Sequence, residues 1–335
     1  MKILLIEDDD ELREYLQVAL RSEGFEVDVA VWPLNEAVYA FNPYVKNLVY
    51  YPEADDYLPW KEELEKKYHR IVYLGDTLEV KYLHRTDNFL GPIPSLEERR
   101  AAAAGQNYIN ETVRTAGFDV KPGQFFLPEL YTSPEEEKIL DRYRQELTTD
   151  GRKIVFWNIS GSTKNKTIVR GFKYIEQVLA QVPDSIHWIV DGFASEYANM
   201  PKDPRVKHAS WDLRTSLLLT QLADVVIGPE SALVNAAGAY DTPKVIFYSH
   251  SAPENLGAGY KNHYPICPNC YCHPCYLLTL NWQDVWDKSA RAAARHQDIQ
   301  CRFMSETDPY RAVGYRCTCT LPEQEIIDTI VKILT

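Results

Sequence analysis

Short apolar runs alternate with longer amphipathic stretches through the first half of the chain. The runs that predict buried strands occupy residues 3–6, 26–31, 45–50 and 70–74. Residues 11–21 carry apolar side chains close to helical spacing, Gly24 ends that helix, and residues 61–67 form a charged helix. Strands that alternate with helices in this way predict parallel βαβ units in a doubly wound sheet.

The same alternation restarts in the second half. Ser133 and Pro134 begin a helix that runs to about residue 147, and residues 148–151 then break the chain. Beyond the break, the predicted strands are residues 153–157, 187–190, 225–227 and 244–248. The predicted helices are residues 170–181, 213–222, 232–238 and 323–334. We therefore predict an α/β protein with two Rossmann-like domains, residues 1–150 and 151–335.

Charge separates the two halves further. The whole chain has a net charge of −12, of which residues 1–150 carry −13 and residues 151–335 carry +1. The acidic first half disfavours a broad surface for nucleic acid or anionic lipid, so the second half is the better candidate for a phosphate-bearing ligand. No apolar run approaches the ~18 residues of a membrane span, and the N-terminus lacks a signal-peptide layout. We expect a cytoplasmic protein without stable membrane insertion.

The segment at residues 223–237 is the most informative one for chemistry. A predicted buried strand ends in Gly228-Pro229, presents Glu230 and Ser231, and runs at once into a helix of small residues. Free N–H groups at the start of such a helix attract anions, and strand ends are where open α/β sheets bind ligands. The alternative is a structural turn in which Ser231 only caps the helix.

This run resembles a segment of the glycosyltransferase family that includes the ADP-heptose:lipopolysaccharide heptosyltransferases, and the likeness is closest to divergent phage and bacterial members. Residues 243–251, residues 254–256 and the Cys272-His273-Pro274-Cys275 cluster extend the resemblance, which is best over residues 153–335. It implies a GT-B fold, in which two Rossmann-like domains face a cleft and the second holds most of the nucleotide-sugar. It also implies inversion at the anomeric carbon and no obligatory metal in catalysis.

By the same resemblance, Lys166 takes the place of the lysine that contacts the donor phosphates, with Lys164 as the competing candidate. Ser162 and Thr163 lie in the same loop after the first strand of the second half. The leaving group of such a transfer is a nucleoside diphosphate, so a lysine aimed at it stabilises the charge that develops there. The alternative for Lys166 is a solvated loop lysine.

The remaining donor-binding residues follow from the family pattern. Glu196 stands where an acid binds the ribose hydroxyls, and is otherwise an exposed acid at a helix start. Arg214 matches an R-x-S pattern before the donor helix, and is otherwise a surface residue. The donor-binding turn itself supplies Glu230, which would face the sugar, with Ser231, Ala232 and Leu233 near phosphate. Asn235 and His250 lie on neighbouring elements and are candidates to support the site, although a lone histidine such as His250 is weighed as structural.

The general base is harder to place. The family uses an Asp in a Gly-Asp turn after the first strand, where it deprotonates the acceptor hydroxyl. Here residues 7–11 read Glu-Asp-Asp-Asp-Glu without a glycine, so Asp10 is the nearest match and Asp9 the next. The same opening also resembles the start of a response-regulator receiver domain, although no acceptor Asp ends the third predicted strand.

All seven cysteines lie after residue 266, in a cluster more typical of metal ligation than of disulfides in a secreted fold. They are Cys267, Cys270, Cys272, Cys275, Cys301, Cys317 and Cys319. The family cluster implies a structural zinc held by four of them, Cys272, Cys275, Cys301 and Cys317, for which the others can substitute. Free thiols or redox-sensitive disulfides are the alternatives.

The resemblance, taken with these patterns, implies an inverting glycosyltransferase that needs no cofactor for catalysis. It would move a sugar from a nucleotide-diphosphate donor to a hydroxyl on a glycan, lipopolysaccharide or modified nucleobase. A non-catalytic nucleotide-sugar-binding protein is the first alternative, because the Gly-Asp turn is lost. A receiver-like signalling protein ranks below both.

Overall fold

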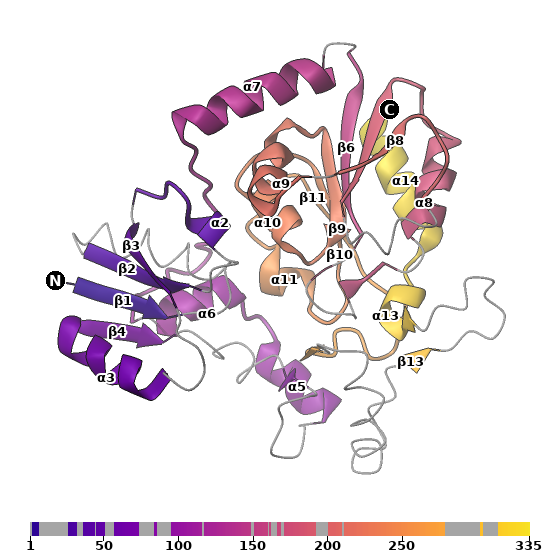
Figure 1. Cartoon of the computed structure of the whole chain (residues 1–335). Coiled ribbons are helices and arrows are strands. Elements are labelled where there is room, and N and C mark those ends of the chain that lie inside the picture. The colour runs from indigo at the N-terminus through magenta and orange to yellow at the C-terminus, as the bar shows by residue number, and fades with distance from the viewer. Residues whose placement is uncertain are drawn as a thin grey trace.

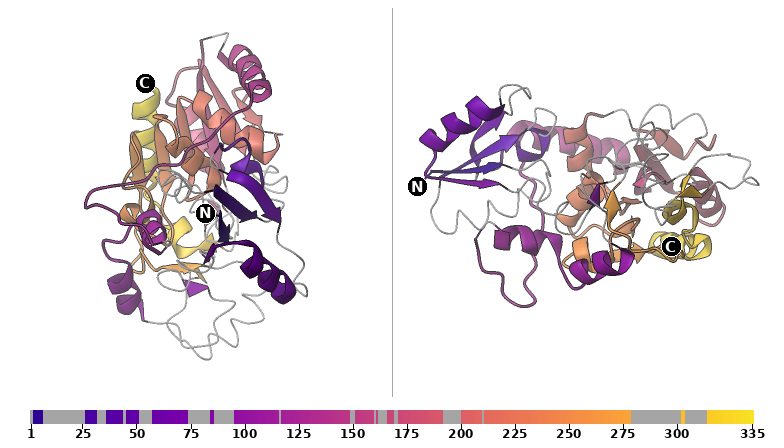
Figure 2. Two further views of the ribbon diagram at one scale, coloured as in Figure 1. Left: turned by 90° about the vertical axis from the view of Figure 1, so that its left-hand side faces the viewer. Right: turned by 90° about the horizontal axis from the view of Figure 1, so that it is seen from below.

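Two parallel sheets, one from each half of the chain, form the framework of the molecule (Figure 1). Figure 2 shows from two further directions that they are separate layers, with the first sheet in indigo. The computed structural model describes residues 2–6, 26–31, 36–43, 45–50, 57–73, 84–85, 95–115, 117–148, 151–159, 161, 166–168, 171–191, 200–209, 211–278, 302–303 and 314–335.

The first sheet has four parallel strands in the order β3-β2-β1-β4. Their bounds are β1 Lys2–Ile6, β2 Glu26–Val31, β3 Val45–Tyr50 and β4 Arg70–Tyr73. A receiver domain places its first strand between the second and the third, whereas β1 here lies between β2 and β4, which is the Rossmann order. The resemblance of the opening residues to a receiver domain is therefore not supported.

Helices bury both faces of this sheet at β2. Four of the six β2 side chains, Val27, Val29, Ala30 and Val31, are at most 1% exposed. They contact two clusters of buried residues, which draw on α3 (Tyr57–Lys67), α5 (Leu96–Ala103) and α6 (Tyr108–Thr115). A capping box at Ser95 and Glu98 begins α5.

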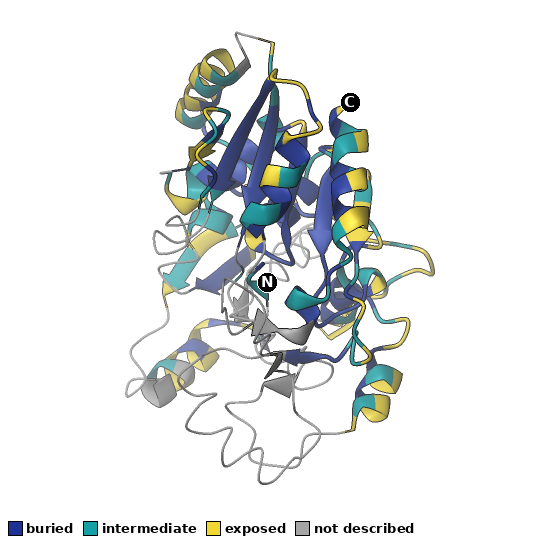
Figure 3. Cartoon of the chain, turned by 90° about the vertical axis from the view of Figure 1, so that its right-hand side faces the viewer, coloured by how far each residue is buried: buried dark blue, intermediate teal, exposed yellow. Residues whose placement is uncertain are grey.

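The second sheet has six parallel strands in the order β11-β10-β9-β6-β7-β8. Their bounds are β6 Lys153–Asn158, β7 Ile186–Asp191, β8 Val206–His208, β9 Val225–Pro229, β10 Lys244–Phe247 and β11 His263–Ile266. Because the four central strands β10, β9, β6 and β7 are covered on both faces, they read as continuous apolar runs rather than as alternating patterns. Figure 3 shows the resulting buried centre of the sheet.

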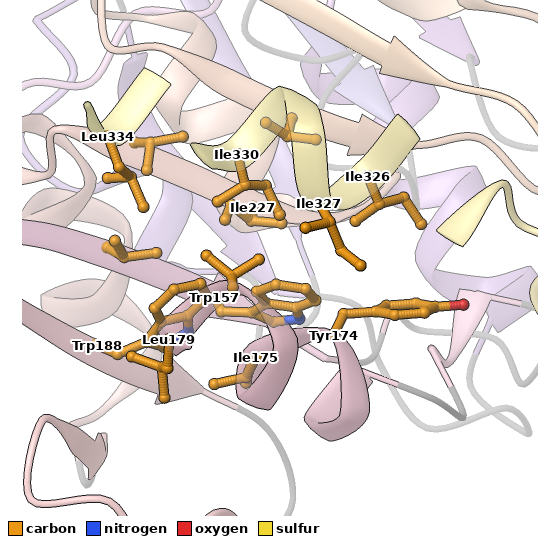
Figure 4. Packing of buried hydrophobic residues seen from close by; sticks show 14 of the residues in the cluster. Trp157, Tyr174, Ile175, Leu179, Trp188, Ile227, Ile326, Ile327, Ile330 and Leu334 are labelled. Atoms are coloured by element: carbon orange, nitrogen blue, oxygen red, sulfur yellow. The ribbon is translucent and has the colours of Figure 1, made fainter. Parts of the chain in front are cut away.

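Each face of this sheet carries its own helices. One face packs on α8 (Gly171–Leu179) and the final helix α14 (Glu323–Leu334), whose Ile326 and Ile330 are fully buried. Figure 4 shows Trp157 and Trp188 beneath that helix, with their rings 5.7 Å apart. The other face packs on α9 (Leu213–Leu219), the 3-10 turn η5 (Thr220–Leu222) and α10 (Ala232–Gly238).

The two halves meet where α5 lies against residues 271–276. Arg99 donates through Nε to the Cys275 carbonyl at 2.6 Å, and Arg100 donates to the carbonyls of Tyr271, His273 and Pro274. Tyr276 is buried in the core of the first sheet, although it comes from the second half of the sequence. A short parallel pair of strands, β5 (His84–Arg85) and β12 (Leu277–Leu278), continues this contact.

The remaining elements connect these layers. They are α2 (Glu36–Tyr39), α7 (Pro134–Thr148), α11 (Pro253–Leu256), α13 (Arg316–Cys319) and the antiparallel pair β13 (Arg302–Phe303) and β14 (Gly314–Tyr315). Leu140 of α7 lies in the core of the second sheet, although it precedes the predicted domain boundary at residue 150. None of the helices in the described ranges is long and apolar enough to cross a membrane.

Candidate functional site

The direction of chain progression across the second sheet reverses between β6 and β9. From β6 the chain builds β7 and β8 toward one edge, and β9, β10 and β11 extend toward the other. In an open α/β sheet, loops leave such a switch point on opposite sides and open a crevice outside the carboxyl ends of the strands. The residues directly after β6, β9 and β10 are therefore the best placed to bind a ligand.

Glu230 follows β9 and is only 2% exposed. Its Oε2 accepts hydrogen bonds from the backbone N–H of Ser249 at 3.3 Å and from Ser249 Oγ at 3.2 Å. Nδ1 of His250 lies 3.0 Å from the same oxygen. Both partners come from the segment after β10, so the neighbouring strand fixes the orientation of this carboxylate.

The other carboxylate oxygen of Glu230 has no hydrogen-bond partner within the described residues. Burial by itself raises the pKa of Glu230, but His250, Lys166 and the Ser249 N–H together lower that pKa below its usual value. Glu230 is therefore ionised at neutral pH with one oxygen saturated and the other bare. A buried acceptor left in this state costs about 1–3 kcal/mol, which a ligand hydroxyl bound to Oε1 would offset.

Lys166 lies close enough to Glu230 for its positive charge to favour the ionised carboxylate. Its side chain passes over Gly161, where an added Cβ would lie 2.8 Å from the Cβ of Lys166. Gly161 thus provides the room that Lys166 occupies, and this is a physical reason for glycine at that position. The structure brings together two of the predicted donor-binding residues, one cationic and one anionic.

Ser231 begins α10, but its hydroxyl makes no capping hydrogen bond. This buried oxygen has no partner among the described residues, so the capping alternative does not account for it. Ala232 is exposed, whereas the Leu233 side chain packs in the core of the second sheet and offers only its backbone to a ligand. Ser231 is therefore the side chain of this turn that remains available.

Arg214 is held by partners from the first half of the chain. Its guanidinium donates to both carboxylate oxygens of Glu136, at 2.9 and 3.1 Å, and to the carbonyls of Ala37 and Tyr131. The side chain is 12% exposed and joins α9 to α7 and α2. In this structure Arg214 ties the second half of the chain to the first, and its role toward a donor stays a prediction.

Several predicted site residues lie outside the described ranges. They are the candidate bases Asp9 and Asp10, the donor-binding candidates Ser162, Thr163 and Glu196, and the candidate zinc ligand Cys301. Their roles stay predictions. The sequence patterns did not identify Ser249 as a partner of Glu230, and they placed His250 beside the site but favoured a structural role for it. The available signal was their position directly after the strand that pairs with β9.

The cysteines gather near the contact between the two halves. Cys272 Sγ donates to Cys270 Sγ at 3.6 Å, and burial raises the pKa of Cys275 to about 11. Burial, together with Cys275 and Cys272, also raises the pKa of Cys317, which places these thiols near one another. Within the described ranges, however, no group of three or more His, Cys, Asp or Glu side chains is arranged to hold a metal ion. The zinc site stays a prediction.

Comparison with protein-family models and with curated proteins gave no match. Among solved structures, the glycosyl transferase family 9 protein from Veillonella parvula DSM 2008 matches at a TM-score of 0.62 and 12% identity, over 99% of this chain and 97% of that one. The ADP-heptose lps heptosyltransferase II of E. coli matches at a TM-score of 0.62 and 13% identity, over 100% of this chain and 98% of its own.

A third structure is the iron-containing dodecameric glycosyltransferase TibC from enterotoxigenic E. coli H10407. It matches at a TM-score of 0.56 and 12% identity, over 99% of this chain and 75% of its own. At identities this low the likeness shows the fold, and it spans almost the whole of this chain. The predicted α/β architecture is thereby confirmed: the chain has the GT-B fold of the heptosyltransferase-like glycosyltransferases.

Proposed function

We propose that this protein is a glycosyltransferase that moves a sugar from a nucleotide-diphosphate donor to a hydroxyl acceptor. One observation carries the proposal: a buried, ionised Glu230 with one bare oxygen lies near Lys166 at the switch point of the second sheet. The fold supports it, since heptosyltransferase II is similar over its whole length and TibC has been solved in complex with ADP-D-β-D-heptose.

The two charged groups suit different parts of such a donor. Lys166 would bind the diphosphate and stabilise the negative charge that develops on it as the glycosidic bond breaks. Glu230 would repel phosphate but accept a hydrogen bond from a sugar hydroxyl through Oε1. The unpaired hydroxyl of Ser231 can donate to a phosphate oxygen between them.

The acceptor side of the reaction rests on the first half of the chain. We propose Asp10, with Asp9 as the alternative, as the base that removes the proton from the acceptor hydroxyl. Attack from the face opposite the diphosphate then inverts the anomeric carbon. The acceptor would be a glycan, a lipopolysaccharide or a modified nucleobase.

A binding experiment tests the donor half of this proposal first. The melting temperature of the protein is measured with ADP, UDP, GDP and dTDP and with a sugar conjugate of each, because a ligand of the folded state raises it by mass action. Lys166→Ala should abolish the shift given by the best ligand, while Lys207→Ala, a change at an exposed lysine of β8, should leave it intact. No shift with any ligand at millimolar concentration would refute the proposal.

A transfer experiment then separates an enzyme from a binding protein. Release of the free nucleoside diphosphate from the bound nucleotide-sugar is followed in the presence of candidate acceptors. Release that depends on an acceptor and is lost in Asp10→Asn supports a transferase. Tight donor binding without release would favour a nucleotide-sugar-binding protein instead.

A further inference from the structure

Unpaired polar groups concentrate at the carboxyl end of the second sheet. Four buried side chains there have an atom without a hydrogen-bond partner among the described residues, namely Asn158 Oδ1, Glu230 Oε1, Ser231 Oγ and Asn235 Nδ2. Native proteins leave few buried polar atoms unpaired, because each forfeits its hydrogen bonds to water. Their concentration beside a sheet switch point indicates that a ligand supplies the missing partners.

Asn158 is the member of this group that the sequence patterns do not single out. It is the last residue of β6 and is 6% exposed. The register pairs Trp157 with Ile227, so Asn158 lies beside Gly228, two residues before Glu230. An added Cβ at Gly228 would lie 3.2 Å from the Asn158 Cβ and 3.0 Å from its carbonyl oxygen, so the glycine leaves the room that this side chain occupies.

The register also sets the scale of the site. Adjacent strands lie about 4.8 Å apart and each residue advances about 3.3 Å, which places the Cα atoms of Asn158 and Glu230 roughly 8 Å from one another. One monosaccharide held between two side chains of this length can hydrogen-bond to both. A sugar hydroxyl can donate a hydrogen bond to the carboxylate, and it can either donate to or accept from the neutral amide. The carboxylate would repel a phosphate, so this pair of side chains suits sugar hydroxyls and not a phosphate.

We propose that Asn158 is a binding residue for the sugar of the donor, and that its amide and Glu230 Oε1 each take one sugar hydroxyl. This inference rests on the proposed function and adds a residue that decides which sugar is accepted. Lys166 and Ser231 bind the nucleoside diphosphate elsewhere in the site, so the affinity for the free diphosphate does not depend on Asn158.

The test compares Asn158→Ala with the wild-type protein by calorimetric titration. The ligands are the nucleoside diphosphate that shifts the melting temperature of the wild type and its sugar conjugate. We expect the variant to bind the nucleotide-sugar about 3- to 10-fold more weakly, as for one lost neutral hydrogen bond, and to bind the free diphosphate unchanged. Equal weakening of both ligands, or of neither, would overturn the inference.

Stability without ligand separates binding from a structural role. The Asn158 amide oxygen has no partner among the described residues, so Asn158→Ala and the volume-matched Asn158→Leu should melt no lower than the wild type. Asn110→Ala is the control for a structural role. Asn110 is also buried with an Oδ1 that has no partner among the described residues, but its Nδ2 donates to the Gln124 carbonyl at 2.8 Å, so this variant should melt lower than the wild type. A clear loss of melting temperature in both Asn158 variants would make Asn158 structural. Failure of the wild type to bind any nucleotide would instead refute the proposed function.

Discussion

Asn255 uses every hydrogen-bonding position of its side chain to join the two halves of the chain. It is fully buried, and its Nδ2 donates to the carbonyls of Ala103 at 3.0 Å and Gln106 at 2.7 Å. Its Oδ1 accepts from the N–H of Ala252 and from the hydroxyl of Tyr276, each at 3.0 Å. Asn255→Asp keeps this shape but replaces the donor by an oxygen that faces two carbonyls.

The cost of that change follows from the contacts. Two hydrogen bonds are lost, and two carbonyls in a buried contact lose a partner, at about 1–3 kcal/mol for each group left unsatisfied. We therefore expect Asn255→Asp to lower the free energy of unfolding by about 3–5 kcal/mol at pH 7. The introduced carboxyl can donate one hydrogen bond when protonated, so the loss should shrink as the pH falls toward 4.

Urea unfolding followed by tryptophan fluorescence measures the difference, at pH 7 and at pH 4.5. Asn262→Asp is the matched control, because the Asn262 Nδ2 also donates to a carbonyl, that of Asp241 at 2.7 Å, but on the exposed surface. That control should cost less than about 1 kcal/mol. If Asn255→Asp is no more costly than the control, or if its cost does not fall at lower pH, the assigned role of Asn255 is wrong.

Three further predictions concern other parts of the molecule. Burial lowers the pKa of Lys244 to about 8 from 10.5, so the folded state binds fewer protons than the unfolded state between these values. The free energy of unfolding of the wild type, measured relative to that of Lys244→Met, should therefore rise by up to about 3 kcal/mol from pH 8 to pH 10.5. The same dependence of the free energy of unfolding on pH in both proteins, measured by urea unfolding, would contradict this. Gly228→Ala should destabilise the protein by about 1–3 kcal/mol in the same assay, because the new Cβ would lie 3.0 Å from the Asn158 carbonyl oxygen in a central strand. Gly171→Ala is the control: its Cβ would meet no neighbour nearer than 3.7 Å, so this change should be neutral or stabilising. If the cysteines hold zinc, elemental analysis of the purified protein should find about one zinc ion per chain, and Cys272→Ser and Cys317→Ser should each lose it. A wild-type protein that is folded but free of metal would show that the cysteines are free thiols.

The framework of both sheets is predictable because its strands are continuous apolar runs. The predicted strand at residues 26–31 and the predicted helix at residues 232–238 have the bounds of β2 and α10, and the four strands predicted in the second half differ from β6, β7, β9 and β10 by one or two residues. The edge strands β8 and β11 were not predicted, because they are short and partly exposed. Fully buried parallel strands carry their own signal in the sequence, since neither face needs polar residues. The GT-B assignment needed more, because alternation alone does not distinguish among doubly wound folds.

No pattern in the sequence predicted the contact between the two halves of the chain. Helix α5 is rich in charged residues and was not predicted, yet its Arg99 is only 8% exposed and donates to the carbonyl of Cys275. Arg214 is a similar case, because its partner Glu136 is 78 residues away. Long-range pairs of this kind depend on how elements dock, and docking is not encoded in local periodicity.

The candidate site shows where the boundary between predictable and unpredictable features lies. Glu230 and Lys166 could be found from motifs, because each follows a strand and carries the charge that the chemistry needs. Asn158 could not, since an asparagine at the end of a strand is ordinary until the register sets it beside Gly228. The same register explains the glycine, which makes room for Asn158 rather than for a turn. Residues that act in pairs across neighbouring strands therefore become visible only once strand order is known, and the specificity of this site depends on such a pair.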